Sequence, residues 1–157
     1  MPQINPKASS NTKTNCAFCN IVQGKTMTYT VFEDDQSLAF LDNRPLFLGH
    51  CLLIPKKHLS TLSDLDPSLI EALFLNVRII AQAVEEAMEA EGTLVAINNK
   101  VSQSVPHLHV HIVPRRKKDG LRGFFWPRIF YRDDKHMEQV QNLIKSAVCV
   151  LGNCWCW

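Results

Sequence analysis

Three histidines occupy alternate positions late in the chain, namely His107, His109 and His111, separated by Leu108 and Val110. Side chains of a strand alternate between its two faces, so the imidazoles are expected on one face and the apolar residues on the other. Imidazole can attack phosphorus, leave again and exchange protons near neutral pH. The pattern therefore favours chemistry on a phosphoryl group, with a metal site and a row of surface histidines as the alternatives.

The residues on both sides of the histidines support phosphoryl chemistry. Upstream, residues 98–106 are rich in amide, hydroxyl and backbone donors, which suit the charged oxygens of a phosphate. Downstream, residues 115–118 read Arg-Arg-Lys-Lys. Such a charge run is typical of a solvated loop, but it could also steer a polyphosphate towards the histidines.

One α+β domain with an antiparallel sheet is expected to position these residues. Apolar alternation between turn residues predicts strands over 28–33, 37–41, 50–54, 93–98 and 107–114. Asp66 and Pro67 predict the start of a long helix, which Gly92 would end. Its buried stripe is expected to comprise Leu69, Leu73, Val77, Ile80, Val84 and Met88. A second helix is expected over about 133–150.

The composition limits the class of protein. A chain of 157 residues suffices for one ordinary domain, and its net charge of +2 argues against a protein that coats nucleic acid. The longest apolar stretches are interrupted by charged residues, which argues against a membrane span. Residues 1–15 are polar and lack the hydrophobic stretch of a secretory signal. We therefore expect a cytoplasmic protein with a disordered tail over 1–15, a single domain over 16–150 and a C-terminal tail over 151–157.

Four separated stretches resemble the histidine-triad (HIT) superfamily, whose signature carries the active site on three alternate histidines. They occur in the family's order and together span about residues 16–115. The resemblance implies a HIT-like fold: a five-stranded antiparallel sheet with one long helix and a C-terminal helix, dimerising through the sheet and the helix. The stretches are 16–24 (Cys-x-x-Cys-Asn-Ile-Val-x-Gly), 38–42 (Leu-Ala-Phe-Leu-Asp), 49–58 (Gly-His-x-Leu-Leu-Ile-Pro-Lys-Lys-His) and 103–115 (Gln-Ser-Val-Pro-His-Leu-His-Val-His-Ile-Val-Pro-Arg).

The resemblance also implies a role for each histidine. His109, which alone has an imidazole neighbour on both sides, would be the nucleophile that takes the nucleoside monophosphate. His111 would contact the phosphate oxygens. His107 would sit beside the nucleophile and help to orient it.

Four further side chains are implied to bind the nucleotide. Gln103 and Ser104 match positions that hold the α-phosphate and the bridging or leaving atom. Asp42 matches the residue that grips the ribose hydroxyls, although a carboxylate at a strand end could equally cap a turn. Asn98 falls near an amide on the phosphate side.

Cys16 and Cys19 form a Cys-x-x-Cys pair, which alone could be a redox pair, half of a zinc site, or neither. No βαβ unit follows the pair, so a thioredoxin-like role is not favoured. Some bacterial HIT proteins complete a zinc site with two histidines. The resemblance therefore implies a structural zinc on Cys16, Cys19, His58 and His107, while the chemistry itself would require no cofactor.

The expected activity is that of a HIT-type nucleotide hydrolase or transferase. The substrate would be a purine nucleoside phosphoramidate or a dinucleoside polyphosphate, attacked at its α-phosphate to form a nucleotidyl-histidine that water then cleaves. A dinucleoside-polyphosphate phosphorylase and a zinc-stabilised nucleotide-binding or interaction module with low turnover are the alternatives. The expected partners are the purine nucleotide and a second copy of the chain, with no nucleic acid and no membrane.

Overall fold

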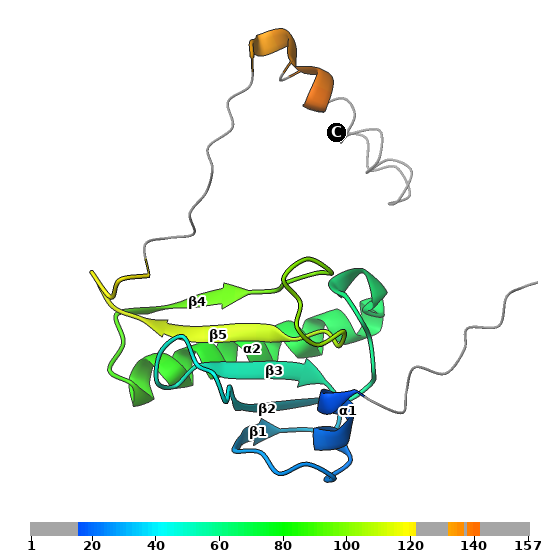
Figure 1. Ribbon diagram of the computed structural model, residues 1–157, viewed down its shortest axis with the longest axis vertical. Coiled ribbons are helices and arrows are strands. Elements are labelled where there is room, and N and C mark those ends of the chain that lie inside the picture. Colours follow the sequence, from blue (N-terminus) through cyan, green and yellow to red (C-terminus); the bar gives the residue numbers. More distant parts are fainter. Residues whose placement is uncertain (1–15, 122–131, 137, 142–157) are drawn as a thin grey trace, which may run out of the picture. The chain divides into compact units, whose positions relative to one another are not determined.

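The computed structural model describes residues 16–121, 132–136 and 138–141. Within them, five strands form one antiparallel sheet in the spatial order β1–β2–β3–β5–β4 (Figure 1). The strands are β1 (Thr30–Glu33), β2 (Ser37–Leu41), β3 (Cys51–Pro55), β4 (Gly92–Ala96) and β5 (Val110–Arg115). The helical elements are α1 (Ala17–Val22), the short 3-10 helix η1 (Leu62–Asp64) and the long α2 (Pro67–Ala87). The expected sheet with one long helix is confirmed.

The chain divides into two units, one ending at Asp119 and one beginning at Gly120. In the second unit, residues 134–136 and 138–141 are helical, which confirms a small C-terminal helix. The rest of the helix expected over 133–150 lies outside the described residues. The tails expected over 1–15 and 151–157 lie outside them as well.

Helix α2 begins where the sequence predicts, with Asp66 as N-cap and Pro67 in the first turn. The backbone N–H of Ser68 donates to the Asp66 carboxylate at 2.9 Å, which satisfies a donor that the first helical turn leaves unpaired. By length and composition α2 could cross a membrane. Its apolar stripe nevertheless packs on the sheet, as in the core helix of a globular domain. The buried stripe comprises Leu73, Val77, Ile80 and Val84, which belong to the same core as Leu108, Val110 and Ile112.

The predicted end of α2 at Gly92 is wrong. The helix ends at Ala87, and the chain then turns through Glu89, which has a positive φ of 51°. The N–H of Ala90 donates to the carbonyl of Glu85 at 2.9 Å and satisfies one of the last helical acceptors. Glu89 therefore takes the left-handed position that glycine often fills, and Gly92 opens β4.

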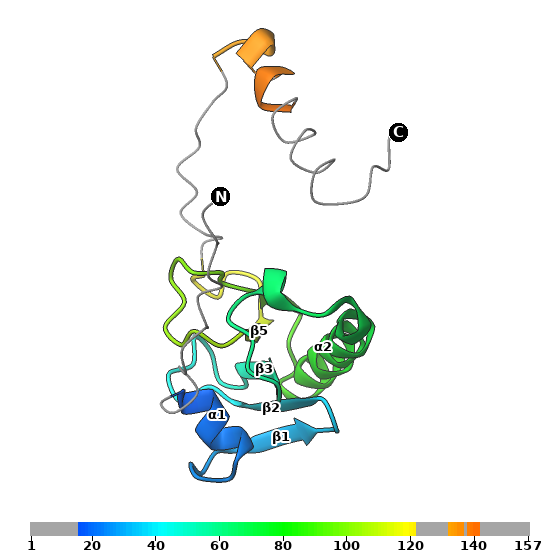
Figure 2. The same cartoon turned by 90° about the vertical axis from the view of Figure 1, so that its right-hand side faces the viewer.

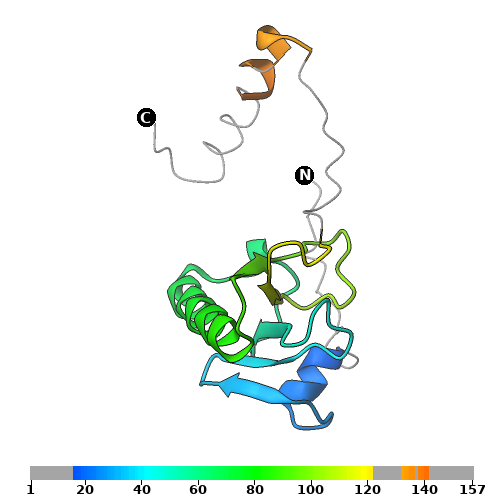
Figure 3. The same cartoon turned by 90° about the vertical axis from the view of Figure 1, so that its left-hand side faces the viewer.

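Helices α1 and α2 cover opposite faces of the sheet (Figures 2 and 3). Because side chains alternate along β2 and β3, Ala39 and Leu53 belong to the core on the α2 side, and their neighbours face α1. Helix α1 was not predicted, since six residues are too few to display a helical period. The core on the α1 side comprises Cys16, Phe18, Cys19, Leu38, Phe40, Leu52 and Ile54.

The strand that carries the histidines is shorter than predicted. Strand β5 begins at Val110, because the backbone just before it bonds to loops rather than to the sheet. The N–H of Leu108 donates to the carbonyl of Leu59, and that of His107 donates to the carbonyl of Val105. The alternation still holds: Leu108 and Val110 lie in the α2-side core, while the histidine rings lie on the side of α1.

Candidate active site and metal centre

A cavity of about 680 Å³ opens beside α1 on the face of the sheet that α1 covers. This volume lies within the range of about 300–1,000 Å³ that small-molecule sites usually have. Four of the side chains predicted from the sequence line it: Asp42, Ser104, His109 and His111. The remaining lining residues are Ala17, Phe18, Ile21, Thr26, Met27, Thr28, Tyr29, Phe40, Leu41, Asn43, Leu52 and Val105. We call this space the triad cavity.

The backbone of His107, two positions earlier in the chain, orients the ring of His109. Its Nδ1 lies 2.7 Å from the carbonyl oxygen of His107. A carbonyl can only accept a hydrogen bond, so Nδ1 carries the proton and Nε2 carries the lone pair. No group among the described residues forms a hydrogen bond with this Nε2. His109 is therefore fixed in the tautomer that a nucleophilic imidazole requires.

A chain of two hydrogen bonds fixes the tautomer of His111. The backbone N–H of Leu46 donates to His50 Nδ1 at 3.2 Å, so the proton of His50 is on Nε2. His50 Nε2 lies 3.0 Å from His111 Nδ1, to which it donates. The remaining proton of His111 is then on its own Nε2. His111 thus presents an N–H donor, as a residue that contacts phosphate oxygens or a leaving group should.

Burial keeps this chain of histidines neutral. Burial, followed by the nearby His109 and His50, lowers the pKa of His111 to about 4. Burial also lowers the pKa of His50, although the Asp42 carboxylate opposes the shift. At pH 7 neither ring is protonated twice, so the direction of the hydrogen bonds deduced above holds.

Asp42 caps a turn and also lines the triad cavity. One carboxylate oxygen accepts from the N–H of Arg44 at 2.8 Å and caps the turn after β2. The other lies 3.6 Å from His50 Nδ1. The side chain also lines the triad cavity, where a ribose diol could donate to it.

Gln103 and Asn98 are not among the described residues that line the triad cavity. Gln103 holds its loop together instead. Its Nε2 donates to the carbonyl of Ser60 at 2.6 Å, and its Oε1 accepts from the N–H of Lys100 at 2.8 Å. Asn98 is half-buried. Of the five side chains predicted to contact the nucleotide, Asp42, Ser104 and His111 line the cavity.

The basic run lies at the far end of β5 from His109 and does not line the triad cavity. Arg115 donates to the Asp119 carboxylate through two nitrogens, and Lys117 lies 3.5 Å from Glu91. These side chains are engaged with neighbouring acidic groups. The interpretation of the run as a surface loop fits this geometry better than a role in steering a polyphosphate.

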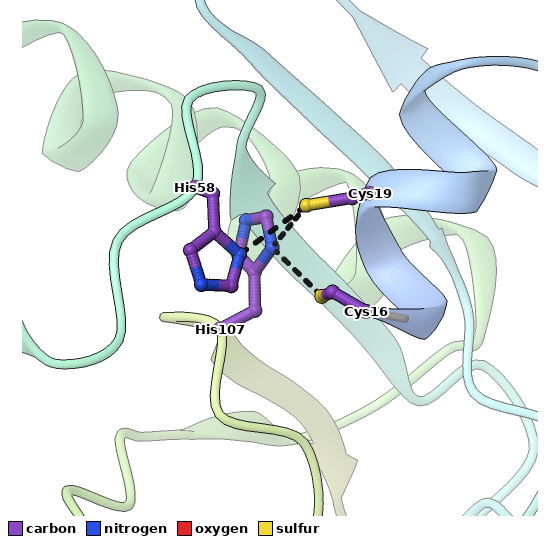
Figure 4. A group of neighbouring side chains, drawn as sticks. All are labelled: Cys16, Cys19, His58 and His107. Atoms are coloured by element: carbon purple, nitrogen blue, oxygen red, sulfur yellow. Dashed lines mark hydrogen bonds between the residues drawn. The ribbon is translucent and has the colours of Figure 1, made fainter. Parts of the chain in front are cut away.

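On the other side of α1, four side chains from three segments converge (Figure 4). His107 Nδ1 lies 3.5 Å from Cys16 Sγ and 3.6 Å from Cys19 Sγ. Cys19 Sγ lies 3.2 Å from His58 Nδ1. In a tetrahedral zinc site with ordinary bond lengths, sulfur and nitrogen ligands are about 3.6 Å apart. We call Cys16, Cys19, His58 and His107 the metal cluster, because these four side chains together could hold one metal ion.

The protonation of His107 suits a metal ligand. Its Nε2 lies 2.8 Å from the carbonyl of Pro55, so Nε2 carries the proton and the lone pair of Nδ1 faces the two sulfur atoms. Burial lowers the pKa of His107, which favours the neutral form that binds metals. A carbonyl as second partner of a ligating histidine is the usual arrangement in zinc sites. The donor set therefore fits a tetrahedral zinc ion.

His107 and Phe18 connect the two sites. The ring of His107 belongs to the metal cluster, while its carbonyl orients His109. Phe18 packs edge-on against His109, with ring centroids 5.3 Å apart, and against His107 at 5.8 Å. Sequence reasoning missed Phe18, because a single aromatic residue between two cysteines carries no signal of its own.

Comparison with known protein families shows to which family this chain belongs. The HIT domain family matches residues 23–118, which is more than half of the chain. The chain belongs to the HIT family. His58, His107, His109, His111 and Asp42 lie inside the matched part, whereas Cys16 and Cys19 precede it.

HIT proteins from several kingdoms resemble this chain. Adenylylsulfatase HINT3 of Arabidopsis thaliana is 33% identical over 150 residues, covering 91% of this chain and 74% of that protein. Protein hit of Bacillus subtilis is 37% identical over 134 residues, covering 84% of this chain and 91% of that protein.

Solved structures of HIT proteins share the fold. A HIT family protein from Bacillus anthracis superposes with a TM-score of 0.74 at 32% identity, covering 88% of this chain and 99% of that one. A histidine triad family protein from Mycobacterium smegmatis, described as zinc-bound, superposes with a TM-score of 0.66 at 34% identity, covering 86% of this chain and 99% of that one.

Proposed function

We propose that this HIT protein cleaves a nucleotide at its α-phosphate through a covalent nucleotidyl-histidine at His109. The observation that carries the proposal is the hydrogen bond from His109 Nδ1 to the carbonyl of His107, which leaves the lone pair on Nε2. The ring lines the triad cavity, and His111 and Ser104 lie in the same lining. Nucleophile, proton donor and hydroxyl are thus available at one place.

The reaction would proceed in two displacements. His109 Nε2 forms a bond to the α-phosphorus as the bond from phosphorus to the leaving group breaks. His111 Nε2–H lies beside the nucleophile, with ring centroids 4.9 Å apart, and donates to the leaving atom or to a phosphate oxygen. Water then attacks the same phosphorus and the P–N bond breaks, which releases the nucleoside monophosphate and free His109. The proton from this water returns to His111 where the leaving group has taken the ring's proton, and otherwise passes to the solvent.

The substrate would be a purine nucleotide whose α-phosphate carries a good or protonatable leaving group. Asp42 would accept from the ribose hydroxyls, and Phe18 and Phe40 supply apolar surface for the base. A phosphoramidate, a dinucleoside polyphosphate and an adenylyl sulfate all meet this description. The last is included because one relative is named an adenylylsulfatase.

We also propose a structural zinc on the metal cluster and a cytoplasmic homodimer. The zinc proposal is supported by the donor geometry and by the zinc-bound relative. When bound, zinc would fix the ring of His107 and so steady the carbonyl that orients His109. The dimer proposal is supported by exposed apolar side chains on the β4 side of the sheet, which is one of its two edges, including Phe74 on α2 and Val95 on β4.

Trapping the covalent intermediate tests the mechanism. The protein is incubated with adenosine phosphoramidate, diadenosine polyphosphate and adenylyl sulfate, each labelled in the adenosine, and quenched in base, because phosphohistidine bonds are labile in acid. We expect a labelled protein adduct in the wild type and none in His109→Asn, with turnover lost in that variant. Near wild-type turnover by His109→Asn would rule out the covalent mechanism. A wild type that binds AMP but turns over no substrate would favour a low-turnover binding module.

A further inference from the structure

Helix α1 forms a wall shared by the metal cluster and the triad cavity. Cys16 is the residue before the helix and Cys19 lies in it, and both sulfur atoms face His107. Three other residues of the same helix, Ala17, Phe18 and Ile21, line the triad cavity. Whatever positions the cysteines therefore also positions the cavity wall.

Helix α1 has little stability of its own. It comprises six residues, and its N-cap, Cys16, makes no side-chain hydrogen bond to the first turn. Isolated helices of this length do not persist in water, so tertiary contacts must hold α1 in place. Those contacts are the apolar core on the α1 side of the sheet and the metal cluster.

Phe18 and His107 transmit the position of α1 to the nucleophile. Phe18 lies between the two cysteines in sequence, and its ring meets the ring of His109 at an interplanar angle of 82°. His107 contributes its ring to the metal cluster and its carbonyl to His109 Nδ1 at 2.7 Å. Two physical connections thus run from the cluster to the same imidazole.

We infer that zinc binding at the metal cluster and nucleotide binding in the triad cavity are thermodynamically coupled through α1, with Phe18 as the coupling side chain. Zinc holds α1 against the sheet and completes the cavity wall, so a nucleotide binds the zinc-loaded protein more tightly. Linkage then requires the nucleotide to strengthen zinc binding by the same factor. This inference rests on the proposed function only in that the cavity binds a nucleotide.

The test uses AMP, which carries the adenosine and the α-phosphate but no leaving group, so binding is measured without turnover. The AMP dissociation constant is measured by calorimetry for the full chain, loaded with zinc and after removal of zinc by a chelator. The zinc dissociation constant is measured by competition with a chromophoric chelator, with and without saturating AMP. We expect both ratios to agree, at about tenfold, within the roughly 5–150-fold range of typical allosteric coupling.

Two variants separate coupling from a general effect on binding. Phe18→Leu keeps apolar bulk in the core but removes the aromatic edge from His109, so both ratios should fall towards one. Met27→Ala is the control: Met27 lines the triad cavity outside α1, is 95% exposed, and its variant should keep the wild-type ratios. Circular dichroism checks that each protein is folded.

Each other outcome overturns the inference. Equal AMP affinity with and without zinc removes the coupling and leaves the nucleotide cavity intact. Absence of AMP binding to the zinc-loaded protein removes both the coupling and the proposed nucleotide site. If the zinc-free protein unfolds, the zinc titrations decide: an unchanged effect of AMP on zinc affinity in Phe18→Leu would show that folding alone links the two ligands.

Discussion

The Nδ1–H of His109 donates to the carbonyl oxygen of His107 at 2.7 Å, while the ring of His107 points away into the metal cluster. One residue thus serves two sites, through its backbone and through its side chain. The bond between these histidines spans two positions in sequence and needs no other element to form. The orientation of the His109 ring depends on the position of the segment just before β5. The ring of His107 and backbone hydrogen bonds to neighbouring loops fix that position.

Removing a cluster thiol should therefore remove the metal. Cys16→Ser replaces one of four ligands, and we expect zinc affinity to fall by more than the roughly 10–100-fold that loss of an outer-shell partner costs. Metal analysis of the purified protein measures the zinc content, and thermal unfolding should show a lower midpoint than in the wild type. Cys51→Ser is the matched control, because Cys51 is buried outside the cluster and donates to the carbonyl of Gly49, as serine also can. Equal zinc content in wild type and Cys16→Ser would refute the assignment.

His50 should influence catalysis through His111 without touching the substrate. His50→Leu removes the donor that fixes the tautomer of His111, so kcat for a phosphoramidate should fall by about 10–100-fold, part of the roughly 10²–10⁴-fold that a positioned general acid supplies. Adenylyl sulfate should be far less affected, because sulfate leaves without a proton. His50→Gln should rescue part of the loss, since its amide can accept from Leu46 and donate to His111. The same loss with both substrates would indicate a merely structural role.

The sequence predicted the elements whose signals are local. Asp66 and Pro67 mark the start of α2, and the alternation of Leu108 and Val110 with the histidines separates the two faces of the sheet. The end of α2 escaped prediction, because Glu89 adopted a positive φ that sequence reasoning reserves for glycine. Each of these features depends on the backbone conformation of only a few consecutive residues.

The site was less predictable, because its geometry depends on long-range packing. The sequence patterns did not indicate that α1 forms or that Phe18 contacts His109, since both follow from the core that α1 shares with β2 and β3. The orientation of Gln103 was equally hidden, because Ser60, which it contacts, lies far away in sequence. The family resemblance supplied the four candidate metal ligands, and the geometry shows that these side chains converge.

Association through the β4 edge of the sheet should depend on the side of α2 that faces β4. Strand β4 lies at the edge and exposes Val95 at 42%. Phe74 is 41% exposed and lies eleven positions, or about three helical turns, before Glu85, so both side chains lie on the same side of α2. Glu85 accepts a hydrogen bond from Thr93 of β4, so this side of α2 faces β4. We expect Phe74→Glu to lower the mass measured by light scattering from twice the 17.9 kDa chain to that of one chain.

The control for this change lies on the same helix. Leu75 is 48% exposed but one position further round the helix, away from β4, so Leu75→Glu should leave the dimer intact. A wild-type protein that is monomeric at micromolar concentration would contradict the dimer proposal directly. Dissociation by both variants alike would place the interface elsewhere on α2.

Stability should fall in mild acid, and His111 should account for part of the fall. Its pKa is about 4 in the folded protein and near the ordinary 6.5 in the unfolded chain, because burial disfavours the charged ring. Between these values the unfolded chain binds a proton that the folded protein does not. The contribution of His111 is therefore fully present above pH 6.5 and is lost as pH falls towards 4.

Urea unfolding of the wild type and of His111→Asn at pH 7.5 and at pH 5 measures this contribution. The wild type should lose more stability between the two pH values than the variant, whose amide does not titrate. His50 and His107 also have pKa values lowered by burial, and zinc binding weakens in acid, so both proteins should retain a common acid sensitivity. The difference between the two proteins isolates His111. An equal loss in both would mean that the buried ring is protonated as readily in the folded protein as in the unfolded chain.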